Sequence, residues 1–250
     1  MQSAKLRVCD AKYKKYLFTV VFFRVNITLY KHRFRGFIME IFSTVIEVIG
    51  VIAFSVSGSM VAIRRKTDLF GVMLLAILTS MGGGLLRDTI FSFSPPAIFG
   101  LKWYLLICVV VSIIVFLIAR KYSKTYLENE TKIEHINDVF DALGLGIFSI
   151  VGTKVGIENG FGNDVVITLS CGVISGIGGG IIRDVLTKSI PFVLVKRIYA
   201  IAAILGSGVY YIMYLFEIND EFAIVTGVLV TFILRLLAMI FKWNMPKAIE

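Results

Sequence analysis

The sequence predicts an all-α integral membrane protein with seven transmembrane helices, arranged as an inverted 3+3 repeat plus a seventh helix. The first observation is composition: 57% of the 250 residues are hydrophobic, 17% are charged, and the mean hydropathy is +0.85. The second is a set of seven apolar runs, each with about the length that crosses a bilayer as a helix. The third is a glycine-rich motif that occurs twice, 96 residues apart.

The composition excludes a water-soluble fold and a disordered chain. Soluble domains are about 45–50% apolar and about 25% charged, so this chain is too apolar and too poor in charge. The apolar runs are continuous rather than alternating, which favours helices over a β-barrel. The predicted spans are residues 41–63, 69–86, 103–119, 139–155, 165–182, 198–216 and 222–241.

Residues 1–38 form a basic N-terminal extension. They carry nine Lys and Arg residues against one acid, whereas residues 39–250 carry 17 basic and 16 acidic residues. The apolar run at residues 17–30 is short and contains Arg24, so we interpret it as an interfacial segment rather than a span. Met39 opens a more typical start for a membrane protein, so a misassigned start codon is the alternative interpretation of this extension.

The loop charges predict the orientation of the body in the plasma membrane. Lys and Arg gather after the first, third and fifth spans and in the C-terminal tail, whereas the alternate loops are poor in them. Because cytoplasmic loops carry the excess of Lys and Arg, the body is predicted with its N-terminus outside and its C-terminus in the cytoplasm. The basic extension would prefer the cytoplasm and opposes this orientation if it belongs to the mature chain.

An internal repeat divides the body. Residues 80–88 read SMGGGLLRD and residues 176–184 read GIGGGIIRD. Upstream, residues 54–58 (FSVSG) match residues 148–152 (FSIVG). Three spans per copy place the two copies in opposite orientations, as in many transporters and channels. The predicted organisation is a first repeat at 39–127, a second, inverted repeat at 128–217, and a seventh helix with the tail at 218–250.

The second helix of each copy contains three consecutive glycines. In a helix interior each glycine costs about 1 kcal/mol relative to alanine. Two interpretations stay open, and they are compatible. The glycines bend or locally unwind the helix and expose backbone groups to a permeation path, or they let two helices pack closely. The candidate path residues are Gly82, Gly83, Gly84, Gly178, Gly179 and Gly180.

Charged residues in or near the spans form a second candidate site. An intramembrane charge costs several kcal/mol unless it is paired or hydrated. Adjacent residues of a helix do not face each other, so each motif Arg is predicted to pair elsewhere: with the other copy's Asp, with Glu47 or Asp141, or with freed carbonyls. Arg235 either extends towards the cytoplasm or neutralises an acid of the bundle. The candidate network, which either locks the two copies together or lines a pore, is Arg87, Asp88, Arg183, Asp184, Glu47, Asp141 and Arg235.

The remaining chemistry argues against an enzyme. Three cysteines and two histidines are scattered along the chain, without the spacing of a zinc site or a catalytic group. The glycine runs do not follow a strand-to-helix turn, so they are not phosphate-binding loops. We expect no catalytic residues, no metal, no cofactor and no nucleic-acid partner, since the basic extension suits a membrane surface.

Together these motifs resemble a family of bacterial membrane proteins related to the trimeric intracellular cation (TRIC) channels, also named the glycine transporter domain family. The resemblance covers about residues 47–246 and includes DLFGV at residues 68–72 and RLLA at residues 235–238. It implies a seven-helix protomer, a homotrimer, and a path inside each protomer between the two glycine-bearing helices. Residues 1–38 lie outside the family pattern, and Glu47 stands where that pattern usually has Asp.

Two functions remain for this site. The first is a channel for a monovalent cation, potassium, favoured by the paired glycine runs and by the resemblance, although the chain lacks the filter motif of tetrameric potassium channels. The second is a secondary transporter of glycine or another small amino acid, in which Glu47 or Asp141 would hold the ammonium group. We favour the channel, with membrane lipid and two further copies of the chain as its partners.

Overall fold

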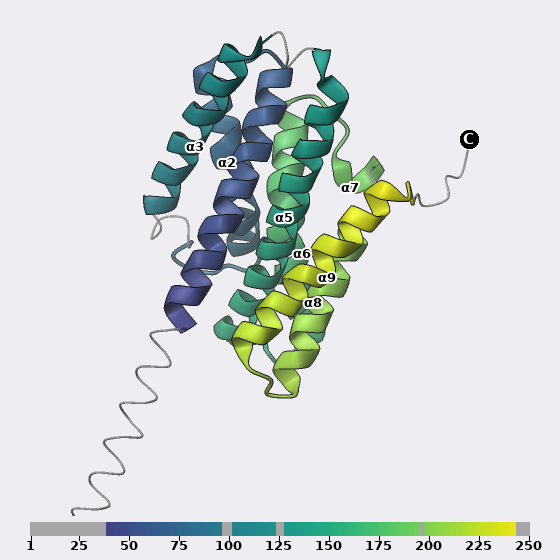
Figure 1. The fold of residues 1–250 in the computed structure, drawn as a ribbon. Helices are drawn as coiled ribbons and strands as arrows, with labels where there is room; N and C mark the ends of the chain where they lie inside the picture. Colours follow the sequence, from purple (N-terminus) through teal and green to yellow (C-terminus); the bar gives the residue numbers. More distant parts are fainter. Residues whose placement is uncertain (1–38, 97–101, 124–127, 196–197, 244–250) are drawn as a thin grey trace, which may run out of the picture. The chain divides into compact units, whose positions relative to one another are not determined.

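The structure is a computed structural model that describes residues 39–96, 102–123, 128–195 and 198–243. The predictions made for residues 1–38 lie outside these ranges. Residues 45–250 form one unit, and every contact described below lies within its described part. The helices are Met39–Arg64, α2 (Leu69–Ile90), α3 (Lys102–Lys121), α5 (Glu130–Gly156) with a π-helical turn η2 (Ile157–Phe161), α6 (Val165–Leu186), α7 (Phe192–Val195), α8 (Tyr199–Leu215) and α9 (Asp220–Ile240) (Figure 1).

Six of these helices are long and apolar enough to cross a membrane. They coincide with six of the seven predicted spans. The sixth predicted span corresponds to α8, an apolar helix of 17 residues that falls below the length of the others. At 1.5 Å per residue α8 is about 26 Å long, against a hydrocarbon core of about 30 Å. The all-helical membrane fold is therefore confirmed, and the count of seven spans depends on α8.

The two glycine-bearing helices begin and end in the same way. Asp68 and Asp164 are their N-caps, and each side chain accepts a hydrogen bond from the amide three residues later, at 2.8 and 3.0 Å. Such caps satisfy amides that the first helical turn leaves unpaired. Just beyond the other ends, Ser92 and Lys188 adopt left-handed conformations with φ of 57° and 52°. Equivalent positions of the two copies therefore give equivalent helix boundaries.

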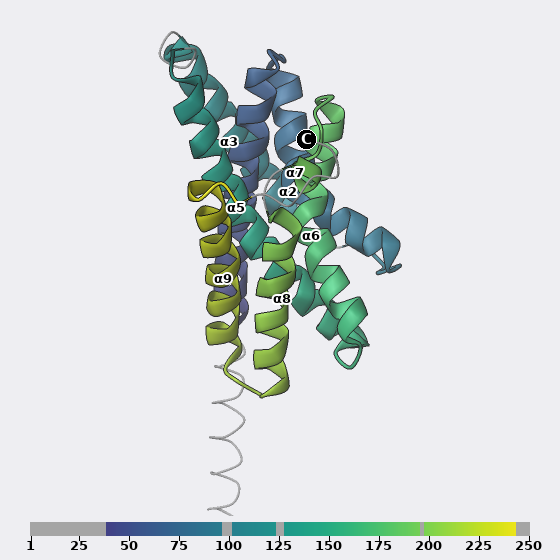
Figure 2. The same cartoon turned by 90° about the vertical axis from the view of Figure 1, so that its right-hand side faces the viewer.

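Helices α2 and α6 lie side by side although about 100 residues separate them in the sequence (Figure 2). A β-carbon added to Gly83 would collide with the carbonyl oxygen of Ser175, and one added to Gly179 would collide with the carbonyl oxygen of Thr79. The contact is thus formed by the two backbones. Close helix packing through the glycines is confirmed.

Both glycine runs lie in uninterrupted α-helix, within segments that the structure describes completely. Of the two effects considered for the glycines, bending and local unwinding, the unwinding is not found in either helix. Figure 2 shows α2 bending along its length without a break in the helix.

Further contacts relate the two copies. Phe54 and Phe148, which are matched positions in the repeat, stack on each other with ring centroids 5.4 Å apart. Gly58 and Gly152, also matched, each lie against the second helix of their own copy. Helix α5 packs against α6, α8 and α9, and α2 packs against α3. This packing brings the ends of the two Arg–Asp motifs into the interior of the bundle.

Candidate functional site

The first charge cluster lies near the end of α2. The Nε atom of Arg87 donates to Oδ1 of Asp88 at 2.8 Å, and Nη2 of Arg87 is 2.6 Å from the same oxygen. Only 5% and 2% of these side chains are exposed. Across the helix contact, Nη1 of Arg87 donates to the Ser175 hydroxyl of α6 at 3.3 Å. The guanidinium therefore joins its own carboxylate partner to the second copy.

The second cluster lies near the end of α6 and is more extensive. The Nε atom of Arg183 donates to Oδ1 of Asp184 at 2.8 Å, as in the first copy. Nη1 of Arg183 also donates to Oδ1 of Asp141 at 2.7 Å and to the Ser57 hydroxyl at 2.8 Å. The Arg183 and Asp141 side chains are fully buried. One guanidinium here serves two carboxylates.

The prediction that neither Arg would pair with its adjacent Asp is wrong in both copies. Adjacent residues point about 100° apart around the helix, but the long Arg side chain bends back far enough to reach the neighbouring carboxylate. The predicted pairing of Arg183 with Asp141 is confirmed. Glu47 takes a different partner, because its carboxylate accepts a hydrogen bond from the Tyr104 hydroxyl at 2.8 Å.

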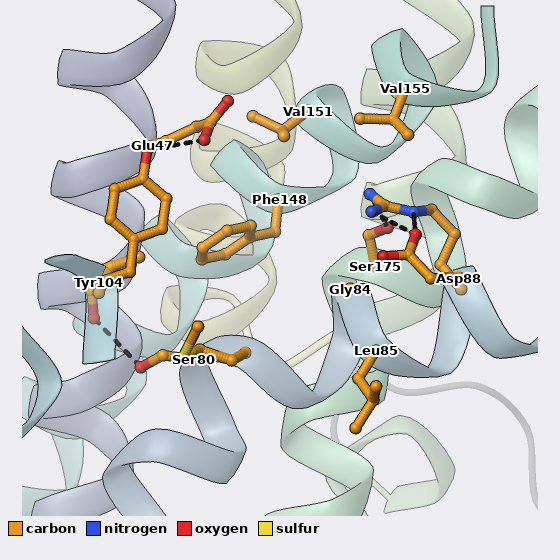
Figure 3. Close-up of a pocket in the computed structure, with 13 residues that line it drawn as sticks. Glu47, Ser80, Gly84, Leu85, Asp88, Tyr104, Phe148, Val151, Val155 and Ser175 are labelled. Carbon is orange, nitrogen blue, oxygen red and sulfur yellow. Dashed lines mark hydrogen bonds and ion pairs between the residues drawn. The ribbon is translucent and has the colours of Figure 1, made fainter. Parts of the chain in front are cut away.

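A pocket of about 290 Å³ opens beside the first cluster (Figure 3). The Glu47–Tyr104 pair lies on one side of it, and Asp88 and Ser175 lie on the other. Phe148 projects between these two polar groups. Five helices contribute the residues that line the pocket: Glu47, Val51, Ser80, Met81, Gly84, Leu85, Arg87, Asp88, Tyr104, Phe148, Val151, Val155 and Ser175.

The corresponding region of the second copy is packed by aromatic rings. Tyr199, which matches Tyr104, lies under the guanidinium of Arg235, 4.7 Å from ring centroid to Cζ. Phe192 lies in the same way under Arg183, also at 4.7 Å. Arg235 is 0% exposed. The interpretation in which Arg235 extends to the cytoplasmic surface is therefore wrong, because the aromatic face and the buried charges keep it inside.

The six candidate glycines divide into two groups by what their missing side chains would meet. The first two of each run, Gly82, Gly83, Gly178 and Gly179, face the opposite helix. The third of each run faces the guanidinium of its own motif: an added β-carbon would lie 3.8 Å from Nη2 of Arg87 at Gly84 and 3.6 Å from Nη2 of Arg183 at Gly180. The first two glycines of each run thus allow close helix packing, whereas the third lies next to the charged group of the same motif.

Sequence reasoning missed two residues that shape the site. The hydroxyl of Tyr104 holds Glu47, and the ring of Tyr199 holds Arg235. Their matched positions in the repeat were the available signal. Among the residues that the structure describes, no group of three His, Cys, Asp or Glu residues could hold a metal ion.

The crossing glycine helices, each ending in a buried Arg–Asp pair, define a polytopic membrane protein with the fold of the TRIC channels. A crystal structure of a prokaryotic TRIC channel in 0.5 M KCl is similar with a TM-score of 0.73 and 33% identity, over 82% of this chain and 100% of that chain. The TRIC orthologue from Rhodobacter sphaeroides gives a TM-score of 0.71 and 28% identity, over 80% of this chain and 98% of that one. A TRIC channel from C. elegans, at 12% identity and a TM-score of 0.53, shares the fold alone.

The chain belongs to the family described as Glycine transporter, whose pattern matches residues 44–120 and again residues 138–215. The UPF0126 inner membrane protein YadS of Escherichia coli K12 is 33% identical over 205 residues, covering 80% of this chain and 92% of YadS. The UPF0126 membrane protein YvgT of Bacillus subtilis is 34% identical over 202 residues, covering 81% and 94%. The family resemblance read from the sequence is therefore confirmed.

Proposed function

We propose that this protein is a TRIC-type channel that conducts potassium through a path inside each protomer, where α2 and α6 cross. The observation that carries the proposal is the pocket beside that crossing, with a half-buried carboxylate, Glu47, on its wall. The structures similar at 28% and 33% identity are TRIC proteins, and one of them was crystallised in KCl. Because Asp88 pairs with Arg87, the guanidinium on the path does not repel a cation by a full charge.

The path would be closed at the glycines in the conformation described. Gly83 and Gly179 bring the two backbones into contact and leave no space for an ion between them. Opening requires α2 and α6 to separate at this point. At Gly83 and Gly179 themselves the contact is between backbones, so a small separation there would expose helical carbonyl oxygens.

The assembly is part of the proposal. We place seven spans in the plasma membrane, with α8 as the shortest, and with the N-terminus of the body outside and the C-terminus in the cytoplasm. Residues 39–127 and 128–217 would be inverted repeats, supported by the reciprocal glycine contacts and by the two matches to the family pattern. The proposal includes a homotrimer in lipid and a permeation role rather than catalysis.

Transport of glycine or another small amino acid is the second candidate. The pocket carries the Glu47 carboxylate on one side and Asp88 on the other (Figure 3), and the Arg87 guanidinium that pairs with Asp88 also lines it. A carboxylate and a guanidinium suit the ammonium and carboxylate groups of an amino acid. Arg87 already binds Asp88, however, so a substrate carboxylate would have to compete with that buried pair. This competition is the reason to favour the channel.

One flux experiment tests both candidates on purified protein in liposomes. A potassium diffusion potential and the entry of labelled glycine are followed in the same preparation. Gly83→Leu and Gly179→Leu place a bulky side chain into the helix contact, whereas Gly208→Leu is the matched control because nothing lies within 4 Å of its added β-carbon.

A passive potassium current, lost in the first two variants, kept in the third and indifferent to glycine, is the result expected of a channel. Saturable glycine uptake without that current would overturn the channel in favour of the transporter. Each variant is checked for its oligomeric state by size-exclusion chromatography, so that a loss of flux is read only from assembled protein.

A further inference from the structure

The matched acids of the two copies, Glu47 and Asp141, have different positive neighbours. Around Asp141, the buried guanidinium of Arg183 binds the carboxylates of both Asp141 and Asp184, and a second buried guanidinium, that of Arg235, lies over the ring of Tyr199. Two buried guanidinium groups therefore accompany two buried carboxylates in this region.

Arg235 comes from outside the repeat. It lies on α9, which has no counterpart in either copy and packs against α5 and α8. Its guanidinium lies over the ring of Tyr199, and its side chain is wholly buried. Helix α9 thus places a fixed positive charge next to Tyr199. In the first copy, the corresponding region surrounds Glu47 and Tyr104.

Glu47 has no such dedicated cation among the described residues. The charges that act on it are those of Lys154, Glu158 and Arg87. Lys154 forms an ion pair of 2.7 Å with Asp220, and Arg87 forms its pair with Asp88. Both positive neighbours of Glu47 are therefore shared with an acid of their own, and the pocket wall carries an excess of negative charge.

We propose that the Glu47–Tyr104 side of the pocket binds a monovalent cation from solution, in the position that corresponds to the Arg235 guanidinium next to Tyr199, the residue that matches Tyr104. The ligand atoms would be the carboxylate oxygens of Glu47 and the phenolic oxygen of Tyr104, with water completing the shell in a pocket of about 290 Å³. A divalent metal is disfavoured because a single carboxylate is a poor site for Ca²⁺ or Mg²⁺. The inference rests on the proposed channel function, since the bound ion would be the permeant one.

Cation binding is measured by thermal unfolding of the purified full-length protein in detergent. KCl is titrated against choline chloride at constant ionic strength. We expect KCl to raise the Tm by roughly 3–6 °C, because a ligand at about ten times its Kd stabilises the folded state. Glu47→Gln keeps an acceptor for Tyr104 but removes the charge, and should abolish the response. Glu217→Gln, at an exposed acid outside the pocket lining, is the matched control and should keep it.

The role of Arg235 is tested by removing its charge alone and together with the charge of Asp141. Arg235→Met leaves an uncompensated carboxylate and should lower the Tm, with a larger KCl response than the wild type because a second site is created. Arg235→Met with Asp141→Asn should recover stability and lose the added KCl response. If Arg235→Met does not fold, the double variant still tests the inference, because it is then expected to fold where the single variant does not.

Three results would overturn the inference. They are a full KCl response in Glu47→Gln, an Arg235→Met variant whose KCl response equals that of the wild type, and a double variant no more stable than Arg235→Met alone. The cation site and the channel function can be refuted independently of each other. A KCl response without potassium flux would contradict the channel function but support the cation site. Potassium flux together with an unchanged KCl response in Glu47→Gln would contradict the cation site but support the channel function.

Discussion

The two Arg–Asp motifs have the same internal geometry and different surroundings. In both, the Arg Nε atom donates to the next residue's carboxylate at 2.8 Å. Arg87 then lies beside a pocket, whereas Arg183 is 0% exposed and shared between Asp184 and Asp141. The difference comes from what packs on each motif: Ser175 and a cavity in one copy, aromatic rings and a second guanidinium in the other.

This comparison shows that a duplicated sequence does not produce duplicated chemistry. The local features that the repeat encodes, such as caps and glycine contacts, occur twice. The long-range partners of the motifs differ between the copies: Arg87 reaches Ser175 of α6, whereas Arg183 reaches Asp141 of α5 and Ser57 of the first helix. Predictions about the first kind of feature should therefore give equal effects in the two copies, and predictions about the second kind should give unequal ones.

The largest expected difference is between the two motif arginines. Arg183→Leu leaves two buried carboxylates without their shared cation and should lower the free energy of unfolding by about 3–5 kcal/mol. Arg87→Leu should cost clearly less, because water in the pocket can hydrate Asp88. Unfolding by SDS titration in mixed micelles measures both, with Arg120→Leu, an exposed arginine, as the control. Equal losses would show that the second cluster is no more desolvated than the first.

The helix contact should respond equally from its two sides. Gly83→Ala and Gly179→Ala each force a β-carbon against a carbonyl of the other helix, and each should cost about 1–3 kcal/mol. Gly208→Ala, with open space around the added carbon, should instead gain up to about 1 kcal/mol from helix propensity. The same SDS titration provides the values. A stabilising Gly83→Ala would contradict the close contact.

The hydrogen bond between Tyr104 and Glu47 belongs to the first copy. Tyr104→Phe should cost about 1 kcal/mol, since it removes a single donor and leaves the ring in place. A double-mutant cycle with Glu47→Leu isolates this bond, because the loss should nearly vanish once the acceptor is gone. Additive losses in the cycle would mean that the Tyr104 hydroxyl stabilises the fold without its bond to Glu47.

The smallest expected effects are at the helix caps. Asp68→Ala and Asp164→Ala each remove a side chain that accepts a hydrogen bond from a first-turn amide, and each should cost about 0.5–1 kcal/mol. Thermal unfolding of the two variants side by side is sufficient, with Asp68→Asn and Asp164→Asn as controls that keep the cap. A loss confined to one copy would indicate that the helix starts are not equivalent.

The sequence predicted the helices because apolar runs of span length have few alternatives in a membrane. It also indicated that the charges in the spans would be paired, since buried charges need partners, and Arg183 does bind Asp141. It could not predict which partners. Whether Arg87 reaches Asp88 or Glu47 depends on side-chain conformations and on which helices cross, and neither is encoded within one motif. Arg235 was the hardest case, because its partner Tyr199 is an aromatic face rather than an acid.

The reciprocal contact at the glycines also constrains how the two copies could change over time. The space that Gly83 leaves is filled by the backbone next to Ser175, and the space that Gly179 leaves is filled by the backbone next to Thr79. A mutation in either run is therefore felt by the other copy. We therefore expect substitutions in the two runs to be coupled, and this coupling is consistent with two nine-residue segments that are still similar 96 residues apart.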